Sequence, residues 1–388
     1  MVHRFIFRSL LFALPLLLII GSAEWLMWKS GEDLTNAEVI ALQAGKKPAL
    51  IFQRGIISQQ FNVYKCAGIN QYRPQILVAG SSRVMKFRDF EFHPFEQNFY
   101  NAGGILQNSN DITGMVDLMV SGKLHTPKCL ILGIDPWWFK SDYADYPTWM
   151  SETTYMSDHA SSFKAHIWGI RWLISNITDI KWRNIIKEND YIGYYAKVKK
   201  GGFRKDGSKS IEKKILDRFQ VTPVFQERED PPIFERIQKC QTVRYSKSSI
   251  DTTVLEHIKL AMDKLRAKGV EIIIYFPPFT DQSFALLEKS EPLKNWWTYY
   301  KKNVFDELNS RSAGAIQAEH PADYGLTDAV FIDGHHPGEI FQAIQLVHFL
   351  KSDNYRGSRL SSVDINYLED RIKKIKMPAL TFDPYTQK

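Results

Sequence analysis

Three short apolar runs constrain the fold of this 388-residue chain more than any other feature of its sequence. They are 76–79 (ILVA), 129–134 (CLILGI) and 270–276 (VEIIIYF), and each is followed by a glycine, an Asp-Pro pair or a Pro-Pro pair. Continuous apolar runs of this length are typical of strands buried on both faces of a parallel sheet. Before the third run, apolar residues recur at helical spacing over 254–265, and Gly269 stands where a C-terminal cap belongs. The sequence therefore predicts an α/β fold, a three-layer sandwich around a mainly parallel sheet.

The first 29 residues (1–29) form a hydrophobic N-terminal segment. Arg4 and Arg8 precede a long apolar run, and apolar character resumes after Glu24 with Trp-Leu-Met-Trp. Three interpretations are open: a retained anchor long enough to cross roughly 30 Å of hydrocarbon, a cleavable signal peptide ending at the small residues 21–23, and a buried core helix. The resumed apolar run and its tryptophans favour the anchor. The basic residues before it predict that the N-terminus stays in the cytoplasm and the rest of the chain lies in the periplasm or beyond.

Composition limits the class of function. Lys and Arg number 50 and Asp and Glu 43, so the net charge of +7 is too small to indicate a nucleic-acid-binding protein. A single long apolar run excludes a polytopic membrane protein. The three cysteines allow one disulfide at most, with Cys66 and Cys240 as the pair that we consider and Cys129 inside an apolar run. We expect no cofactor and no metal, because no ligand cluster in the sequence has the spacing of a metal site.

Beyond the anchor, we expect a connector over 30–70, an extracytoplasmic α/β domain over 71–350, and a C-terminal helix and tail over 351–388. Residues 140–250 lack clear strands and are expected to form an insertion in this domain. The insertion holds 20 Lys or Arg and 14 Asp or Glu, so it carries +6 of the total charge. Its most basic stretch, 197–209, is either a solvated loop or a site for an anionic glycan, a lipid phosphate or a partner loop.

Three short segments carry the residues from which we expect chemistry. The first is Gly-Ser-Ser-Arg at 80–83, where a serine hydroxyl would be exposed at the C-terminal edge of the sheet. The second is Asn-Ala-Gly-Gly at 101–104, whose glycines let backbone N–H groups approach a bound oxygen closely. The third is Asp-Gly-His-His-Pro at 333–337. An aspartate three residues before a histidine can accept the imidazole Nδ1–H and direct Nε2 outward, as in the base half of a serine triad.

The order and spacing of these segments resemble the SGNH/GDSL hydrolase superfamily, over about residues 71–139 and 250–350. The resemblance implies a flavodoxin-like strand order. It implies Ser82 as the nucleophile, because in that family the nucleophile lies two residues after the glycine. It also implies His336 as the base and Asp333 as the acid that orients it.

The resemblance bears on several neighbouring residues as well. His335 would be the base only if the register slipped by one residue. The oxyanion would be held by the N–H of Ser82 and by the N–H of Gly103 or Gly104, which the resemblance does not separate. A metal site built from the same aspartate and the two histidines is the least favoured alternative.

One position departs from the pattern of that superfamily. The family usually has an asparagine after the third strand, where its side chain donates a hydrogen bond to the oxyanion, and the corresponding residue here is Asp135. An ionised carboxylate cannot donate a hydrogen bond. Asp135 is then protonated by burial, or has another role such as capping the next turn, or leaves the oxyanion to backbone N–H groups alone.

Three further side chains are candidates for substrate contact, together with Asp135. Arg83 could hold an anionic substrate, with a surface salt bridge as the alternative role. Trp137 and Trp138 could line a glycan cleft, with a place in the core at the end of a strand as the alternative.

A subgroup of the superfamily fits the whole chain better. The single N-terminal membrane helix, the Gly-Ser-Ser segment and the aromatic third segment resemble membrane-anchored SGNH-like proteins of cell-envelope polymer acylation, of the teichoic-acid D-alanylation and polysaccharide O-acetylation types. This resemblance implies a serine acyltransferase that moves an acyl group, expected to be acetyl, onto a cell-envelope polysaccharide or lipid-linked glycan, beside a membrane-bound O-acyltransferase. The alternatives are a membrane-tethered carbohydrate esterase or deacetylase, and a catalytically inert polysaccharide-binding or assembly module.

Overall fold

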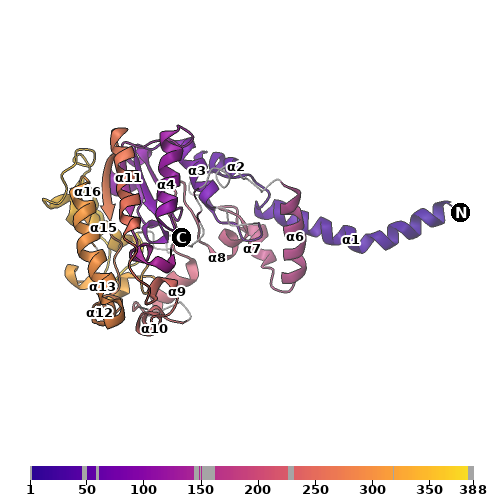
Figure 1. Cartoon of the computed structure of the whole chain (residues 1–388). Helices are drawn as coiled ribbons and strands as arrows, with labels where there is room; N and C mark the ends of the chain where they lie inside the picture. Colours follow the sequence, from indigo (N-terminus) through magenta and orange to yellow (C-terminus); the bar gives the residue numbers. More distant parts are fainter. Residues whose placement is uncertain are drawn as a thin grey trace. The chain divides into compact units, whose positions relative to one another are not determined.

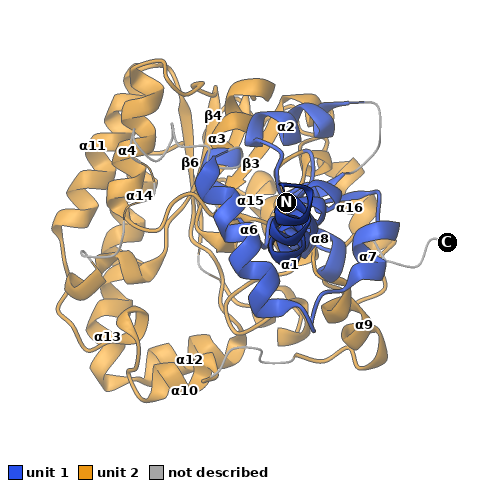
Figure 2. Cartoon of the chain, turned by 90° about the vertical axis from the view of Figure 1, so that its right-hand side faces the viewer, with its two compact units in different colours: residues 1–64, 157–205 blue, residues 65–156, 206–388 orange. Residues whose placement is uncertain are grey.

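A computed structural model of the chain describes residues 2–45, 50–57, 61–143, 148, 150, 162–225, 231–317 and 319–382. The chain divides into two compact units, shown in different colours in Figure 2. The first unit joins residues 1–64 to residues 157–205, and the second joins residues 65–156 to residues 206–388. We describe each unit separately.

A five-stranded sheet forms the centre of the second unit. Its strands are β2 (Ile76–Gly80), β3 (Phe99–Gly103), β4 (Cys129–Gly133), β6 (Glu271–Tyr275) and β7 (Ala315–Ile316). They run in the order β3-β2-β4-β6-β7, and all neighbouring pairs are parallel. The α/β class and the parallel sheet predicted from the sequence are therefore confirmed. The three predicted strands are present within one residue of their predicted ends, whereas the two-residue strand β7 is too short to have left a recognisable apolar run.

The strands bury both of their faces, which explains why their sequences are continuously apolar. Successive side chains of a strand point to opposite faces, so Leu77 and Ala79 join one core while Ile76 and Val78 join the other. Helices α3 (Phe61–Tyr72), α4 (Ser109–Val120) and α11 (Thr253–Ala267) supply side chains to the first core. Helices α15 (Glu339–Lys351) and α16 (Ile365–Lys373) supply side chains to the second. The result is three layers, and Figure 2 shows the strands with α4 and α11 on one side and α15 and α16 on the other.

Helix α11 illustrates how the sequence positions these layers. Its apolar residues at helical spacing form one buried stripe, which includes Val254, Ile258 and Leu265. Gly269 follows the helix with a φ of +77°, a conformation that costs a glycine little because it has no Cβ. The chain then turns directly into β6.

The strand order contains one reversal in the direction of winding. The chain passes from β2 to β3 on one side of β2 and then to β4 on the other side, so the direction of winding reverses between β2 and β4. In doubly wound sheets, ligands bind outside the carboxyl ends of the strands at such a reversal. The segments that follow β2 and β4 therefore lie where a site is expected.

The remaining helices of this unit connect or cover the sheet. They are α9 (Lys213–Val221), α10 (Ile233–Gln238), α12 (Asp281–Lys289), α13 (Glu291–Thr298), a π-helical turn over Tyr299–Val304, and α14 (Phe305–Ser310). The predicted C-terminal helix is α16, and its Leu368 is buried in the second core.

The first unit contains the N-terminal helix α1 (Val2–Ser30) and a small set of elements packed on its end. These are α2 (Asn36–Ala44), the parallel pair β1 (Ile51–Phe52) and β5 (Tyr191–Ile192), α6 (Phe163–Asn176), α7 (Trp182–Lys187) and α8 (Tyr194–Lys199). The buried carboxylate of Glu32 accepts hydrogen bonds from the N–H groups of Gly55, Ile56, Ile57 and Tyr194. One side chain thereby joins the two separate chain segments of this unit.

Helix α1 is long and apolar enough to cross a membrane. None of its most apolar 18-residue stretch is buried, so the interpretation as a core helix does not hold for it. Only the end of α1 is packed, where Ala23, Leu26 and Met27 are buried. Met27 lies so close to Gly169 of α6 that a Cβ added there would come within 2.2 Å of its sulfur.

The compact units do not follow the boundaries expected from the sequence. The predicted insertion at 140–250 is shared, since residues 157–205 pack with 1–64 and residues 206–250 pack with the sheet. Trp149 and 151–161 lie outside the described residues. All three cysteines are free thiols, so the pairing considered for Cys66 and Cys240 is not formed.

Candidate active site

Ser82 lies at the carboxyl edge of the sheet, at the reversal point between β2 and β4. Strand β2 ends at Gly80, and Ser82–Val84 forms a single 3₁₀ turn whose N-cap is Ser81. The Ser81 hydroxyl accepts a hydrogen bond of 3.2 Å from the Arg83 N–H. Val84 packs on the strand ends so closely that a Cβ added to Gly80 would lie 3.0 Å from it, and one added to Gly133 would lie 2.4 Å from it. Two glycines therefore allow the serine turn to sit directly on the sheet.

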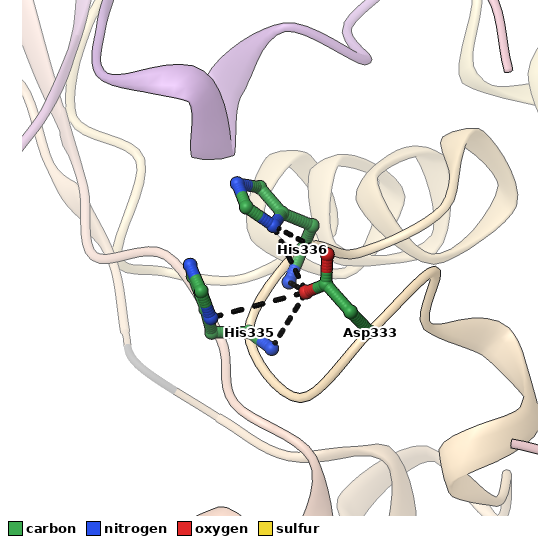
Figure 3. Close-up of side chains that lie close together, drawn as sticks. All are labelled: Asp333, His335 and His336. Atoms are coloured by element: carbon green, nitrogen blue, oxygen red, sulfur yellow. Dashed lines mark hydrogen bonds and ion pairs between the residues drawn. The ribbon is translucent and has the colours of Figure 1, made fainter. Parts of the chain in front are cut away.

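His336 and Asp333 reach the same point from the loop before α15. The His336 Nε2 atom lies 2.8 Å from the Ser82 Oγ atom, and the His336 Nδ1 atom lies 2.8 Å from an Asp333 carboxylate oxygen. Because a carboxylate can only accept, the Nδ1 atom carries the proton and Nε2 faces the serine as an acceptor. Figure 3 shows the aspartate and the two histidines of this loop. The structure thus brings together the three residues expected to form a triad.

The loop that carries the two residues is fixed by its own backbone. The Asp333 carboxylate accepts hydrogen bonds from the N–H groups of His335 (3.1 Å) and His336 (2.9 Å). The Gly334 carbonyl accepts from Thr280 Oγ1 (3.2 Å) and Ser283 Oγ (3.0 Å) at the start of α12. This second pair of contacts could not be predicted from the sequence, because Thr280 and Ser283 resemble an ordinary helix N-cap.

The electrostatics keep Asp333 ionised. Burial alone would raise the pKa of Asp333, but His336 and His335 and the hydrogen bonds that they donate outweigh burial and hold the pKa well below its usual range. A negative Asp333 stabilises the imidazolium that forms when His336 takes a proton.

His335 has a different environment from His336. It is 1% exposed, its ring packs edge-on against Trp137, and its Nδ1 atom is 3.8 Å from the nearer Asp333 oxygen. Burial, and then the neighbouring His336, lower the pKa of His335 well below its usual value, so the ring is neutral. His336 rather than His335 faces the serine, in the register that the resemblance implied.

Arg83 does not reach an open surface. Its side chain is buried and donates to the carbonyls of His335 (Nε, 3.0 Å) and Pro277 (Nη2, 2.9 Å), and also to the carbonyl of Pro278. Its Nη1 atom lies 3.0 Å from the Asp135 carboxylate, which is equally buried. We expected Arg83 to contact an anionic substrate or to form a salt bridge at the surface. Both expectations are wrong, because the side chain and its partner are buried.

The Arg83–Asp135 ion pair also accounts for the departure at the third segment. Asp135 is the position where the family resemblance led us to expect an amide donor, and its carboxylate pairs with Arg83, which belongs to the same turn as the serine. The Oδ1 atom of Asp135 therefore accepts from Arg83, while no partner of its Oδ2 atom is found among the described residues. Neither side chain would show this role in the sequence, since 52 positions separate them.

Trp137 and Trp138 are core residues. Both are buried, and they belong to the hydrophobic core that covers one face of the sheet. Trp137 lies between two guanidinium groups, at 5.3 Å from Arg83 and 4.9 Å from Arg244. The two tryptophans therefore pack in the core and do not line a glycan cleft, because both rings of the short 3₁₀ turn Pro136–Phe139 are buried.

The two glycines proposed as oxyanion donors already have acceptors. The Gly103 N–H donates to the Asn101 side-chain oxygen (2.7 Å), and the Gly104 N–H donates to the Gly80 carbonyl (2.8 Å). The Asn101 amide in turn donates to the carbonyl of Val84 in the serine turn (2.9 Å). Within the part of the chain that the structure describes, no acceptor is recorded for the Ser82 N–H. Of the three expected oxyanion donors, Ser82 is the one with a free N–H.

The same loop is the one place in the described residues where three metal-ligating side chains meet. Ligand atoms of Asp333, His335 and His336 lie within 4.8 Å of one another. The proton between Asp333 and His336 and the contact of His336 with Ser82 occupy two of these side chains. A metal ion would have to displace both hydrogen bonds, so the donor set fits a serine triad better than a metal centre.

No protein-family model matches this chain, and no curated protein matches it either.

Proposed function

We propose that this chain is an extracytoplasmic serine acyltransferase that moves an acyl group, expected to be acetyl, onto a cell-envelope polysaccharide. The observation that carries the proposal is the unbroken line of hydrogen bonds from Asp333 through His336 to the Ser82 hydroxyl. The line ends at the reversal point of a doubly wound sheet, where such folds bind their ligands. Membership of the SGNH/GDSL superfamily is part of the same proposal, because it rests on the motifs at these positions.

In the first half-reaction, Ser82 Oγ attacks the carbonyl carbon of an acyl ester or thioester while His336 Nε2 takes the hydroxyl proton. The tetrahedral intermediate carries its negative charge on the former carbonyl oxygen, near the Ser82 N–H. It collapses when the bond to the leaving alcohol or thiol breaks and His336 returns the proton to that group. The product is acyl-Ser82.

In the second half-reaction, a sugar hydroxyl attacks the acyl-serine, and His336 takes its proton. The ester bond to Ser82 breaks, Ser82 Oγ regains a proton from His336, and the acylated glycan leaves. Water could replace the sugar without any change in these steps. Esterase activity therefore differs from transfer only in the acceptor that reaches the acyl-enzyme.

The scarcity of oxyanion donors favours a second candidate, an inert polysaccharide-binding or assembly module. Each essential donor contributes roughly 3–4 kcal/mol of transition-state stabilisation in serine hydrolases. With the N–H groups of Gly103 and Gly104 engaged and Asp135 paired with Arg83, this conformation offers little beyond Ser82. A membrane-bound O-acyltransferase could supply the missing donors by repositioning the segment of Gly103 and Gly104, and the triad would then be active.

We further propose that α1 is retained as an anchor, with the rest of the chain outside the cytoplasm. The length and exposure of α1 support this proposal, as does the unbroken helix through the predicted cleavage region at 21–23. His166 on α6 also contacts Glu24 of α1 at 2.8 Å.

The test is fluorophosphonate labelling of the full-length protein in detergent, with the adduct located by mass spectrometry. We expect an adduct on Ser82 that is lost in His336→Ala and reduced in Asp333→Asn. His320→Ala is the matched control, because it breaks another histidine–aspartate pair of the same unit, with Asp281 at 2.5 Å. Labelling that survives His336→Ala, or that never occurs on Ser82 even with membrane fractions added, would reject the catalytic proposal in favour of the binding module.

A further inference from the structure

One face of α6 carries an apolar stripe that the first unit leaves uncovered. Phe163, Ile167, Ile174 and Ile177 recur at intervals of four, seven and three residues, which places them on one side of a helix. All four are exposed, and Phe163 reaches 81%. The opposite side of α6, with Ala165, Gly169 and Leu173, is the side that is buried. Helix α6 is therefore apolar on two faces, of which only one is packed.

The short helix α7 extends this apolar surface. Trp182 and Ile186 lie four residues apart on α7, and both are exposed. The Trp182 ring is 5.9 Å from that of Trp25, near the end of α1. The exposed surface of α6 and α7 is thus continuous with the apolar helix α1.

Cations accompany this apolar surface. Between Ser162 and Lys187 the sequence holds five lysines or arginines and one acidic residue, Asp179. All five cations are exposed: Lys164, Arg171, Lys181, Arg183 and Lys187. Among the described residues, none of the five forms an ion pair. An apolar stripe flanked by exposed tryptophan, lysine and arginine is typical of a helix that lies in a membrane interface.

The orientation of α6 relative to α1 suits such a position. In Figure 1 α1 runs across the page while α6 runs up it, and in Figure 2 α1 is seen end-on while α6 is seen along its length. Helix α6 therefore crosses α1 steeply. Of the helices of this unit other than α1, α6 also lies nearest to the projecting part of α1 in Figure 1. A bilayer crossed by α1 would have α6 lying along its surface.

We propose that α6 and α7 bind the surface of the bilayer that α1 crosses, with the apolar stripe among the headgroups and the cations on anionic lipid phosphates. This inference rests on the proposed anchoring of α1 and is independent of the chemistry at Ser82. From the sequence, this segment was predicted only to be part of a basic insertion. The structure adds the contact with the membrane surface that we propose for it. The contact would hold the unit against the membrane at two places rather than one.

The test uses full-length protein with Cys240→Ser, reconstituted into vesicles that contain anionic lipid, with an environment-sensitive fluorophore on one introduced cysteine. Cys66 and Cys129 are buried and do not compete for the label. The labelled positions are Ile174 on the stripe, Phe12 in α1, and Leu260 on α11, which is 60% exposed against 58% for Ile174. Quenching by lipids spin-labelled near the headgroup reports whether each position contacts the bilayer.

We expect quenching at Ile174 by the shallow quencher, with a shift of its emission to shorter wavelength, and no quenching at the matched control Leu260. Lys181→Glu with Arg183→Glu and Lys187→Glu should reduce the Ile174 signal in anionic vesicles and leave it unchanged in zwitterionic ones. Quenching at Phe12 without quenching at Ile174 would overturn this inference and leave the anchor intact, and the stripe would then need a protein partner. A Phe12 label that stays in water would overturn the anchor and this inference together, while labelling of Ser82 would still stand.

Discussion

The Arg83–Asp135 pair is the residue-scale feature that most separates this site from a simple serine triad. Arg83 follows the proposed nucleophile directly, and its guanidinium holds the ends of β4 and β6 and the histidine loop through Asp135, Pro277 and His335. The guanidinium thus connects the segments that follow β4 and β6 to the loop that carries His336. We therefore expect the pair to position the site.

Removing one partner of this pair should be costly. We expect Asp135→Leu to lower the free energy of unfolding by about 3–5 kcal/mol, because it leaves the Arg83 charge buried without a partner. Asp135→Asn keeps an oxygen that can accept from Nη1 and should cost less. Chemical denaturation of the two variants checks the order. Equal stability of both with the natural protein would show that the pair is not structural.

A second buried acid predicts how stability depends on pH. Burial, and then the nearby Glu339, raise the pKa of Glu91 well above the ordinary value of 4.5. The folded protein thus holds this proton more tightly than the unfolded chain does. Protonated Glu91 contributes fully to the free energy of unfolding below pH 4.5. This contribution is lost as the pH rises toward the folded-state pKa, at up to about 1.4 kcal/mol per pH unit.

Glu91→Gln should therefore raise the free energy of unfolding at neutral pH and flatten its dependence on pH above 4.5. The amide keeps the shape of the protonated acid and has no charge to bury. Urea titrations at several pH values measure the effect, with the exposed Glu291→Gln as the control. A parallel pH dependence in the Glu91 variant would contradict the assignment.

At the scale of elements, the close approach of the serine turn to β4 decides where Ser82 sits. Strands β2 and β4 are in register from Ile76 with Cys129 to Ala79 with Leu132, so both end at the same level of the sheet. Val84 then covers the two strand ends, and glycine at 133 is what makes room for it. The register of β2 and β4 therefore helps to determine the position of the serine turn.

Gly133→Ala should displace the turn, because the new Cβ would lie 2.4 Å from the Val84 side chain. We expect a loss of about 1–3 kcal/mol in stability and a larger proportional loss of fluorophosphonate labelling at Ser82. Val84→Ala removes the clashing methyl groups, so the double variant should recover labelling relative to Gly133→Ala alone. Failure of the second substitution to restore any labelling would mean that the close approach does not set the serine position.

At the scale of the whole molecule, the proposed retention of α1 predicts where the mature chain begins. If α1 is retained, the chain purified from membranes should begin before residue 21 and should resist extraction by alkaline carbonate. N-terminal sequencing and extraction test this directly. A mature chain that begins at Glu24 and stays soluble would show that α1 is a cleaved signal.

Much of the fold could be predicted from the sequence because it depends on local patterns. The parallel sheet followed from continuous apolar runs, and the sheet's long helix α11 followed from its spacing and Gly269. The short strands β1, β5 and β7 could not be predicted, since two residues carry no periodicity. The grouping of 157–205 with 1–64 was also hidden, because contacts such as Glu32 with Tyr194 join positions far apart in the chain.

For the candidate site, the sequence by itself determined two local relations: a serine directly after a strand, and an aspartate three residues before a histidine. That Ser82 meets His336, 254 positions away, was an expectation from the family resemblance, because only tertiary packing brings the two together. Only the tertiary structure decided which side chains are available. Arg83, Asp135, Trp137 and Trp138 became buried, and the N–H groups of Gly103 and Gly104 found internal acceptors. Whether a polar group faces a ligand or a neighbour depends on what the rest of the chain places beside it, and a sequence motif does not contain that information.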